Sequence, residues 1–320
     1  MSPESAVSPV SPARQALSTW FRPRGAWIAS VLIACMLTLH AVVPNRVGRL
    51  GSLLETFLPW LGLAVPVLAG VALLRRSPVA LAAVLPPLAA WLALFGGLLL
   101  PRSDGAYDLT AVQHNVSDVN PDPAGTARTL LRADADLIAL EEVTPSHARE
   151  FTAALDYPHH AVVGTVGLWS RYPLTDVRAV DIRPTGVGTD WNRGLRATAA
   201  TPSGEVAVYV AHLPSVRLGA GFDTALRDES AALLARALDA EPLPDLLLLG
   251  DLNSTVDDRG LDPVRAHVNA PSRGLAFSWP ASFPLARIDQ ILARDATVTR
   301  IWTLPDTDSD HVPIAARIRL

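Results

Sequence analysis

Long apolar runs dominate the first hundred residues of the chain. Three of them, at 26–43, 53–74 and 79–100, are each close to the ~20 residues that a helix needs to cross the hydrocarbon core of a bilayer. The only charged residue inside them is Glu55, near the start of the second run. Buried helices of soluble domains are usually shorter and more often interrupted by polar residues. The pattern therefore predicts three transmembrane helices.

A second pattern begins near residue 104, where strand-like segments alternate with segments of helical period. Helices are expected at 124–133, 146–155, 223–238 and 261–267. Strands are expected at 109–115, 136–140, 161–170, 175–182, 195–201, 205–212, 246–250, 287–293, 297–304 and 312–320. Many consecutive strands with a few covering helices favour two β-sheets packed face to face with helices outside, a four-layer α/β sandwich.

Together the two patterns divide the chain into three expected regions. Residues 1–25 are rich in Ser, Pro and Ala and are expected to form a disordered cytoplasmic tail. Residues 26–103 form the membrane domain, and 104–320 form the sandwich. With the N-terminus in the cytoplasm, five arginines beside the spans lie inside and three lie outside. This bias predicts a multi-pass protein of the cell membrane with an extracellular sandwich domain.

The charge of the sandwich domain limits its partners. All 27 basic residues of the chain are Arg; 19 of them follow residue 104, as do 28 of the 31 acidic residues, which leaves a net charge near −9. Proteins that hold a nucleic-acid backbone usually present a basic surface, because neutralising phosphates supplies much of the affinity. The acidic balance therefore argues against a long nucleic acid as the partner.

Acidic and polar residues recur at the ends of the expected strands. Gly-Asp-Leu-Asn at 250–253 follows a run of four leucines, and Ser-Asp-His at 309–311 precedes the last strand. The other candidates are Asn115, Glu142, His212 and, within the strand at 287–293, Asp289. Strand ends on one edge of a sandwich can converge on one place, so these side chains are expected to form a single site.

The chemistry of these candidates indicates which ion and which reaction the site suits. Oxygen ligands without a cluster of Cys or His suit a hard cation such as Mg²⁺ or Mn²⁺ rather than zinc. Such a cation neutralises a phosphoryl oxygen and positions an attacking water. A His held by a carboxylate is suited to accept a proton from that water. The inventory predicts metal-assisted hydrolysis of a phosphoester.

The motifs also resemble those of a known family. Asn115, Leu-Glu-Glu-Val at 140–143, Gly-Asp-Leu-Asn at 250–253, Arg-Ile-Asp at 287–289 and Ser-Asp-His at 309–311 occur in the order found in the endonuclease/exonuclease/phosphatase superfamily, which includes DNase I. The resemblance extends over roughly residues 108–320. With three expected spans ahead of it, the chain is similar to the membrane-anchored bacterial branch that includes the VanJ-type proteins of teicoplanin resistance.

The resemblance implies a role for each matching residue. It implies that Glu142, with Asn115 beside it, binds the metal, and that Asp310 is the second acidic residue near it. It implies that His311 is the catalytic histidine and is oriented by Asp289.

It further implies that Asp251 and Asn253 orient the water and the phosphate, and that His212 steadies a phosphate oxygen or protonates the leaving group. Arg193 lies where relatives often have an arginine that contacts the substrate; a solvent-exposed turn arginine fits the same position. The chain departs from the family at Glu141, where many members have Gln.

Three functions are compatible with these residues. The connector at 101–107 is short and would hold the domain close to the bilayer, which favours a phospholipid or a lipid-linked pyrophosphate of wall synthesis as the substrate. An extracellular metal-dependent nuclease is the second function. The third is a non-catalytic protein that binds a wall precursor or an antibiotic, against which the retention of every polar position argues.

Overall fold

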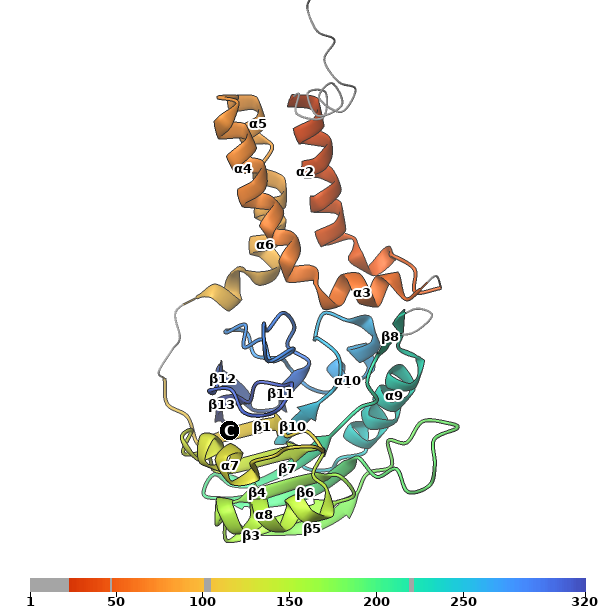
Figure 1. Cartoon of the computed structure of the whole chain (residues 1–320), viewed down its shortest axis with the longest axis vertical. Helices are drawn as coiled ribbons and strands as arrows, with labels where there is room; N and C mark the ends of the chain where they lie inside the picture. Colours follow the sequence, from red (N-terminus) through yellow and green to blue (C-terminus); the bar gives the residue numbers. More distant parts are fainter. Residues whose placement is uncertain (1–22, 47, 101–104, 219–221) are drawn as a thin grey trace, which may run out of the picture. The chain divides into compact units, whose positions relative to one another are not determined.

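A computed structural model describes residues 23–46, 48–100, 105–218 and 222–320 (Figure 1). The expected tail at 1–25 therefore lies outside the described residues except for its last three. The chain separates into two compact units. One combines Val43–Phe57 with Gly97–Leu320, and the other contains Leu58–Gly96 with the described residues up to Val42. The predicted boundary at residue 103 thus does not account for Val43–Phe57, which groups with the sheets.

The helical unit corresponds to most of the apolar half of the sequence. Its α-helices are α2 (Pro23–Thr38), α4 (Ala64–Leu74), α5 (Pro78–Ala82) and α6 (Leu85–Phe95). Prolines lie in the first turn of α5 and α6, where their missing N–H has no helical partner to lose. Ser77 caps α5, because its hydroxyl oxygen accepts the amide of Ala80 at 3.2 Å.

Within the described residues, one helical segment, Pro78–Leu99, is long and apolar enough to cross a membrane. Leu50–Thr56 and Leu58–Leu74 meet the same test only as a broken pair, and Arg24–Thr38 is apolar but shorter. The break falls at Phe57, just before the 3-10 helix η2 (Leu58–Leu63). Pro59 favours a break here, because it lacks the N–H that an uninterrupted α-helix would bond to the carbonyl oxygen four residues earlier. Three transmembrane helices therefore remain a prediction.

The other unit is built around two mixed β-sheets, which confirms the predicted α/β sandwich (Figure 1). In the six-stranded sheet the order is β12 (Thr297–Thr303), β13 (Ile314–Arg319), β1 (Leu109–Asn115), β2 (Leu137–Glu141), β4 (Val166–Ser170) and β3 (His159–Val163). In the five-stranded sheet it is β11 (Asp289–Arg294), β10 (Leu246–Asp251), β7 (Gly204–Ala211), β6 (Gly194–Thr201) and β5 (Leu174–Ala179). One pair in each sheet is parallel, β1 with β2 and β10 with β7.

The strand β10 shows how the sequence positions the sheets. Leu247 and Leu249 lie in the core between the two sheets, whereas Leu246 and Leu248 pack beneath the helices on the outer face. Because side chains alternate along a strand, a strand covered on both faces needs an unbroken apolar run. Each buried leucine contributes about 1.5–3 kcal/mol.

Helices cover the outer face of each sheet. α7 (Pro123–Leu131) and α8 (Pro145–Leu155) pack on the six-stranded sheet, and their buried residues share one core with those of β1, β2 and β4. α9 (Ala225–Asp239), η4 (Arg259–Leu261) and α10 (Asp262–Arg265) share the core beneath the five-stranded sheet. A small ribbon of β8 (Arg217–Leu218) and β9 (Phe222–Asp223) completes the described strands of this unit.

The single strand predicted at 161–170 is instead a hairpin of β3 and β4. The turn uses Gly164, whose φ of +59° is rarely adopted by other residues. A Cβ there would lie 1.9 Å from the carbonyl oxygen of Asn192, so only glycine fits. Residues 161–163 before the turn are all apolar, and most of those at 166–169 after it are too, so the two strands look like one continuous apolar strand.

A buried ion pair lies on the outer face of the five-stranded sheet. Arg196 Nη2 is 2.8 Å from Glu241 Oε1, and both side chains are almost fully buried. Burial alone would raise the pKa of Glu241, but hydrogen bonds from Arg196, the amide of Leu243 and the hydroxyl of Tyr209 outweigh burial and lower it to about 2. The ionised carboxylate therefore stabilises the fold.

Because the folded-state pKa is below the ordinary value, this stabilisation is complete above pH ~4.5 and is lost as the pH falls towards 2. We expect Glu241→Gln to lower the free energy of unfolding by about 3 kcal/mol at pH 7, since it removes the buried charged partner of Arg196 and leaves only the exposed carboxylate of Asp176 paired with it. Thermal unfolding of the detergent-solubilised protein measures both effects. The wild type should lose more stability than Glu241→Gln between pH 5 and 3.

The control is Asp134→Asn, which removes an exposed partner of Arg171. It should change the free energy of unfolding by less than ~1 kcal/mol, because exposed ion pairs contribute little. Equal losses for the two variants would contradict a stabilising role of the buried pair.

Candidate active site

The polar side chains meet at one end of the space between the two sheets. Along β1, Leu109 and Ala111 face the other sheet, so the alternation places Gln113 and Asn115 on the same face. Along β2 the same alternation places Glu141 there, and along β10 it places Asp251 there. The residues that continue each apolar row are therefore the polar residues of the site.

Two hydrogen bonds join the sheets at this end. Asn115 Nδ2 donates to Asp251 Oδ2 at 3.1 Å, and Gln113 Nε2 donates to Asp289 Oδ1 at 2.9 Å. Gln113 Nε2 also donates to Glu141 Oε2 at 2.7 Å. All five side chains are buried, so these contacts form where water is largely excluded.

His311 lies between two carboxylates. Its Nδ1 is 2.8 Å from Asp289 Oδ2, and its Nε2 is 3.8 Å from Asp251 Oδ2. Asp251 and Asp289 are paired across β10 and β11, which fixes their spacing. One ligand atom from each of the three residues lies within 4.8 Å of the others, a spacing that could hold a metal ion.

The turn after β10 is fixed by Gly250 and Asn253. A Cβ on Gly250 would lie 1.9 Å from the carbonyl oxygen of Ala211, so only glycine allows β10 to approach the end of β7. Asn253 has a φ of +47°, which asparagine adopts more readily than most residues. Its amide N–H donates to Asp251 Oδ1 at 2.9 Å, and its Nδ2 donates to the carbonyl oxygen of Leu213 at 2.9 Å.

A second group of side chains adjoins Asp251. His212 Nε2 lies 3.6 Å from Asp251 Oδ2 and 3.9 Å from Glu142 Oε1. Arg193 Nη1 lies 3.2 Å from His212 Nδ1, and its guanidinium is 5.2 Å from the centre of the Trp191 ring. The structure therefore brings Arg193 into the site and does not place it in an isolated surface turn.

Asp310 stands apart from the other sequence candidates. Its side chain is exposed, and its backbone carbonyl accepts the amide of Ala281 at 2.7 Å. Its charge still helps to raise the pKa of His311. The structure thus brings together eight of the nine predicted site residues, Asn115, Glu142, Arg193, His212, Asp251, Asn253, Asp289 and His311, and leaves the ninth exposed to solvent nearby.

Burial and the neighbouring charges shift the pKa values of the ionisable groups in the site. Burial raises the pKa of Asp251 to about 7, assisted by Asp289 and opposed by His311. Burial would lower the pKa of His311, but Asp289 and Asp251 outweigh it and raise the pKa to about 10. Burial, together with the carboxylates of Asp289 and Asp251, raises the pKa of Glu141 well above its usual value. The cluster concentrates negative charge, which the positive charge of His311 and partial protonation of the carboxyl groups relieve.

Burial also determines the charge of the second group. It lowers the pKa of His212 well below its usual value, and the neighbouring charge of Arg193 lowers it further. Burial lowers the pKa of Arg193 as well, although the carboxylates of Glu142 and Asp251 oppose this. His212 is therefore a neutral imidazole beside a partly desolvated guanidinium.

Sequence reasoning missed two residues that support the site. Gln113 joins Glu141 to Asp289, as described above, and the period of two from Asn115 was the signal that could have found it. Ser309 donates its hydroxyl to the carbonyl oxygen of Asn115 at 2.7 Å and accepts the amide of His311 at 3.1 Å. It thus ties the segment that carries His311 to the end of β1.

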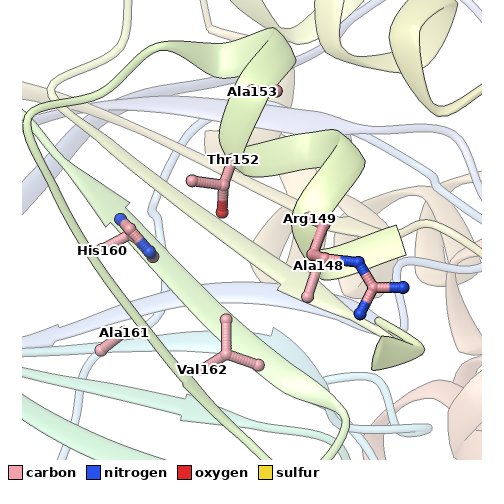
Figure 2. Close-up of a pocket in the computed structure, with 7 residues that line it drawn as sticks. All are labelled: Ala148, Arg149, Thr152, Ala153, His160, Ala161 and Val162. Atoms are coloured by element: carbon pink, nitrogen blue, oxygen red, sulfur yellow. The ribbon is translucent and has the colours of Figure 1, made fainter. Parts of the chain in front are cut away.

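A hollow elsewhere on the domain differs from this site. It has a volume of about 510 Å³ and lies between α8 and the edge strand β3 (Figure 2). Arg149 and His160 are among its lining residues, and it contains no carboxylate. The candidate chemistry is therefore at the strand ends and not in this hollow.

Comparison with known proteins places the domain in a family. Residues 111–311 match the model of the endonuclease/exonuclease/phosphatase family, and the chain belongs to that family. No curated protein sequence matches the chain.

Solved structures share the fold at low sequence identity. Sphingomyelinase C from Streptomyces griseocarneus is 19% identical with a TM-score of 0.51, over 65% of this chain and 98% of that one. A mannosyl-6-phosphatase from Bacteroides thetaiotaomicron is 17% identical with a TM-score of 0.55, over 66% and 100%. Beta toxin from Staphylococcus aureus, with bound magnesium ions, is 18% identical with a TM-score of 0.52, over 66% and 99%.

The donor set fits the divalent cation that the family implies. Carboxylate oxygens of Asp251 and Glu142 and the amide of Asn115 are hard ligands of the kind that Mg²⁺ and Mn²⁺ prefer. Burial is the main cause of the raised pKa of Asp251, so its ionised form is costly unless a nearby positive charge compensates it. The remaining buried oxygen of Glu141, Oε1, has no hydrogen-bond partner among the described residues.

Gly250 provides a test of the local backbone. We expect Gly250→Ala to lower the free energy of unfolding by about 3 kcal/mol, because its Cβ would overlap the backbone of Ala211. Gly70→Ala, where a Cβ would meet open space, is the control and should be neutral or slightly stabilising. Thermal unfolding measures both, and equal stability of the two variants would contradict the close approach.

Proposed function

We propose that the protein is a membrane-anchored phosphoesterase that depends on Mg²⁺ or Mn²⁺. We further propose that it acts at the outer face of the cell membrane on a lipid-linked phosphate or pyrophosphate. The observation that carries the proposal is the His311 imidazole held by Asp289 and facing Asp251, with the amide of Asn115 in contact with the same aspartate and the carboxylate of Glu142 next to His212 beside it. Phosphoester hydrolysis needs a cation site, a proton acceptor and donors to phosphate, and the cluster contains residues suited to each role.

In this proposal the proton acceptor is His311. Its Nδ1–H donates to Asp289, which leaves Nε2, directed towards Asp251, as the atom that takes a proton from water when the ring is neutral. Asp289 also stabilises the imidazolium that forms, because the two groups are buried together. Asp289 is thus a positioning residue for the ring as well as its counter-ion.

The cation would be held by Glu142, Asn115 and Asp251, with Asp310 the further ligand implied by the family. When bound it neutralises a phosphoryl oxygen, positions the attacking water and, through its positive charge, lowers the pKa of groups nearby. The lower pKa suits His311 to act as a base at neutral pH.

In this proposal Arg193, His212 and Asn253 would bind the phosphate group of the substrate. Arg193 Nη1 lies 3.2 Å from His212 Nδ1 and 3.4 Å from its Nε2, and in this proposal the neutral ring carries its proton on Nε2 and donates it to a phosphate oxygen. The partly desolvated guanidinium binds a phosphate more strongly than an exposed one does. The Trp191 ring holds that guanidinium in place.

The choice of a lipid substrate rests on the sequence. The sandwich domain carries a net charge near −9, from 19 arginines and 28 acidic residues beyond residue 104, which disfavours a long polyanion. The expected spans would place the site next to a bilayer, and the arginine bias favours its outer face. A phosphate attached to a lipid meets both conditions, and the link to glycopeptide resistance follows only if that lipid is a carrier of wall synthesis.

The test uses the purified full-length protein in detergent with Mg²⁺ or Mn²⁺, supplied side by side with a polyprenyl pyrophosphate, phospholipids and plasmid DNA. We expect hydrolysis of a lipid substrate, measured as released phosphate or headgroup. His311→Ala should lower kcat by about 10²–10⁴, the usual contribution of a general base. His267→Ala, which removes a histidine outside the cluster, should retain full activity.

Each outcome decides between the functions. Full activity of His311→Ala would contradict its assigned role. Hydrolysis of plasmid DNA alone would overturn the lipid substrate in favour of a nuclease. Absence of hydrolysis of all three substrates would favour a binding protein.

Metal binding can be measured without turnover. We expect Mn²⁺ to raise the unfolding temperature of the full-length protein, because a cation that binds only the folded state stabilises it. EDTA should reverse the effect, and Asp251→Asn should reduce it strongly because it removes a charged ligand. Asp134→Asn is the control. An equal rise for Asp251→Asn and wild type would contradict a cation site at Asp251.

A further inference from the structure

The segment Val43–Phe57, which we term the interspan segment, covers the sequence between the first and second apolar runs together with Val43, which ends the first run, and the first five residues of the second. It nevertheless belongs to the same compact unit as the two sheets. Its helix α3 (Leu50–Thr56) packs against η4, which follows the loop after β10. A segment expected to join two membrane helices is therefore part of the catalytic unit.

The interspan segment is attached through a buried ion pair. Glu55 Oε1 is 2.7 Å from Arg259 Nη2, and Glu55 Oε2 accepts both Arg259 Nε at 2.9 Å and the Arg259 amide at 3.0 Å. The side chain of Glu55 is only 1% exposed. Arg259 Nη1 also donates to the carbonyl oxygen of Val43 at 2.8 Å. Glu55 and Arg259 are 204 positions apart in the sequence, and their bidentate pair fixes the orientation of the interspan segment on η4 as well as its distance.

The backbone of the interspan segment is shaped for this contact. A Cβ on Gly51 would lie 2.7 Å from Arg259 Nη2 and 2.6 Å from the carbonyl oxygen of Val43, so only glycine lets the guanidinium lie against α3. Asn45 and Ser52 bond to each other twice, through Nδ2 to Oγ and through the Ser52 amide to Oδ1, each at 2.9 Å. The segment is thus folded around Arg259.

From Arg259 the contacts continue to the loop that carries Asn253. The next residue back, Asp258, accepts Arg227 Nη1 at 2.6 Å and is fully buried. The same Nη1 donates to the carbonyl oxygen of Asn253 at 3.2 Å and to Ser254 Oγ at 3.0 Å. The loop 252–258 is therefore held at its far end by two ion pairs, one of which is made to the interspan segment.

We infer that Glu55 and Arg259 are positioning residues for the active site: docking of the interspan segment holds the loop 252–258 so that Asn253 is correctly placed beside Asp251. The inference rests on the proposed function for its activity readout only. The region at 26–103 is then more than a tether, because part of it completes the catalytic unit.

The experiment uses the full-length protein in detergent with four variants. Glu55→Gln and Arg259→Gln each break the pair, the exchange Glu55→Arg with Arg259→Glu restores it with reversed charges, and Gly51→Leu displaces α3 without changing any charge. Hydrogen exchange followed by mass spectrometry reports the opening of the loop 252–258 directly. Activity on the substrate identified above reports the consequence.

We expect exchange in 252–258 to speed up by roughly tenfold or more in the two Gln variants and in Gly51→Leu, since a lost buried contact promotes local opening. We expect kcat to fall by roughly tenfold or more with little change in KM, because small misplacements cost that much. The double variant Glu55→Arg with Arg259→Glu should recover part of the protection from exchange and part of kcat. A general loss of packing would speed exchange across the sheets as well and would not be rescued by the exchanged pair.

Arg171→Gln, which removes an exposed ion pair at Asp134, is the matched control and should change neither readout. Unchanged exchange in 252–258 for Glu55→Gln and Gly51→Leu would overturn the inference whatever the activity. If the wild type hydrolyses none of the substrates but exchange responds as expected, the docking stands and the proposed function fails.

Discussion

Buried negative charge is the constraint on which the rest of this structure depends. Asp251, Asp289 and Glu141 all point into the end of the space between the sheets, where solvent cannot screen them. His311 supplies one compensating charge, and the amides of Gln113 and Asn115 supply donors. Without the two sheets to hold these donors in place, the carboxylates would repel one another and draw in water.

This constraint explains why several residues around the site position the charged side chains without belonging to the candidate site themselves. Ser309 holds the segment before His311, Gly250 lets the two parallel strands converge, and Trp191 supports Arg193. Each of them limits the freedom of one charged group. The apolar rows of β1, β2 and β10 have the same effect on a larger scale, because they determine which side chains reach the inter-sheet space.

Much of this was accessible from the sequence. The four leucines of β10 and the alternation along β1 predicted buried strands, and each strand carries its polar residue at the end where the site forms. The family motifs predicted which residues would meet, with the exception of Asp310, whose side chain is exposed. The sandwich itself followed from the number of strands and the presence of only a few helices.

Other features depend on contacts that no local pattern reveals. Gly164 makes a turn only because Asn192 lies beside it, so one predicted strand became two. In the sequence Glu55 is an isolated acidic residue near the start of an expected membrane span. Only its ion pair with Arg259, 204 positions away, explains why it is there. Asp310 directly precedes a buried histidine, yet its own side chain turns to solvent, and sequence adjacency could not distinguish the two orientations.

The pairing of β1 with β13 has a consequence for how the molecule is made. These strands lie at the two ends of the domain, with Gln113 opposite Ile314, and they are neighbours in one sheet. A ribosome therefore releases the last strand only after every other strand has been synthesised, and until then one edge of β1 has no partner. Unpaired strand edges promote association between chains, so the nascent domain is most prone to aggregate in the interval before β13 pairs with β1.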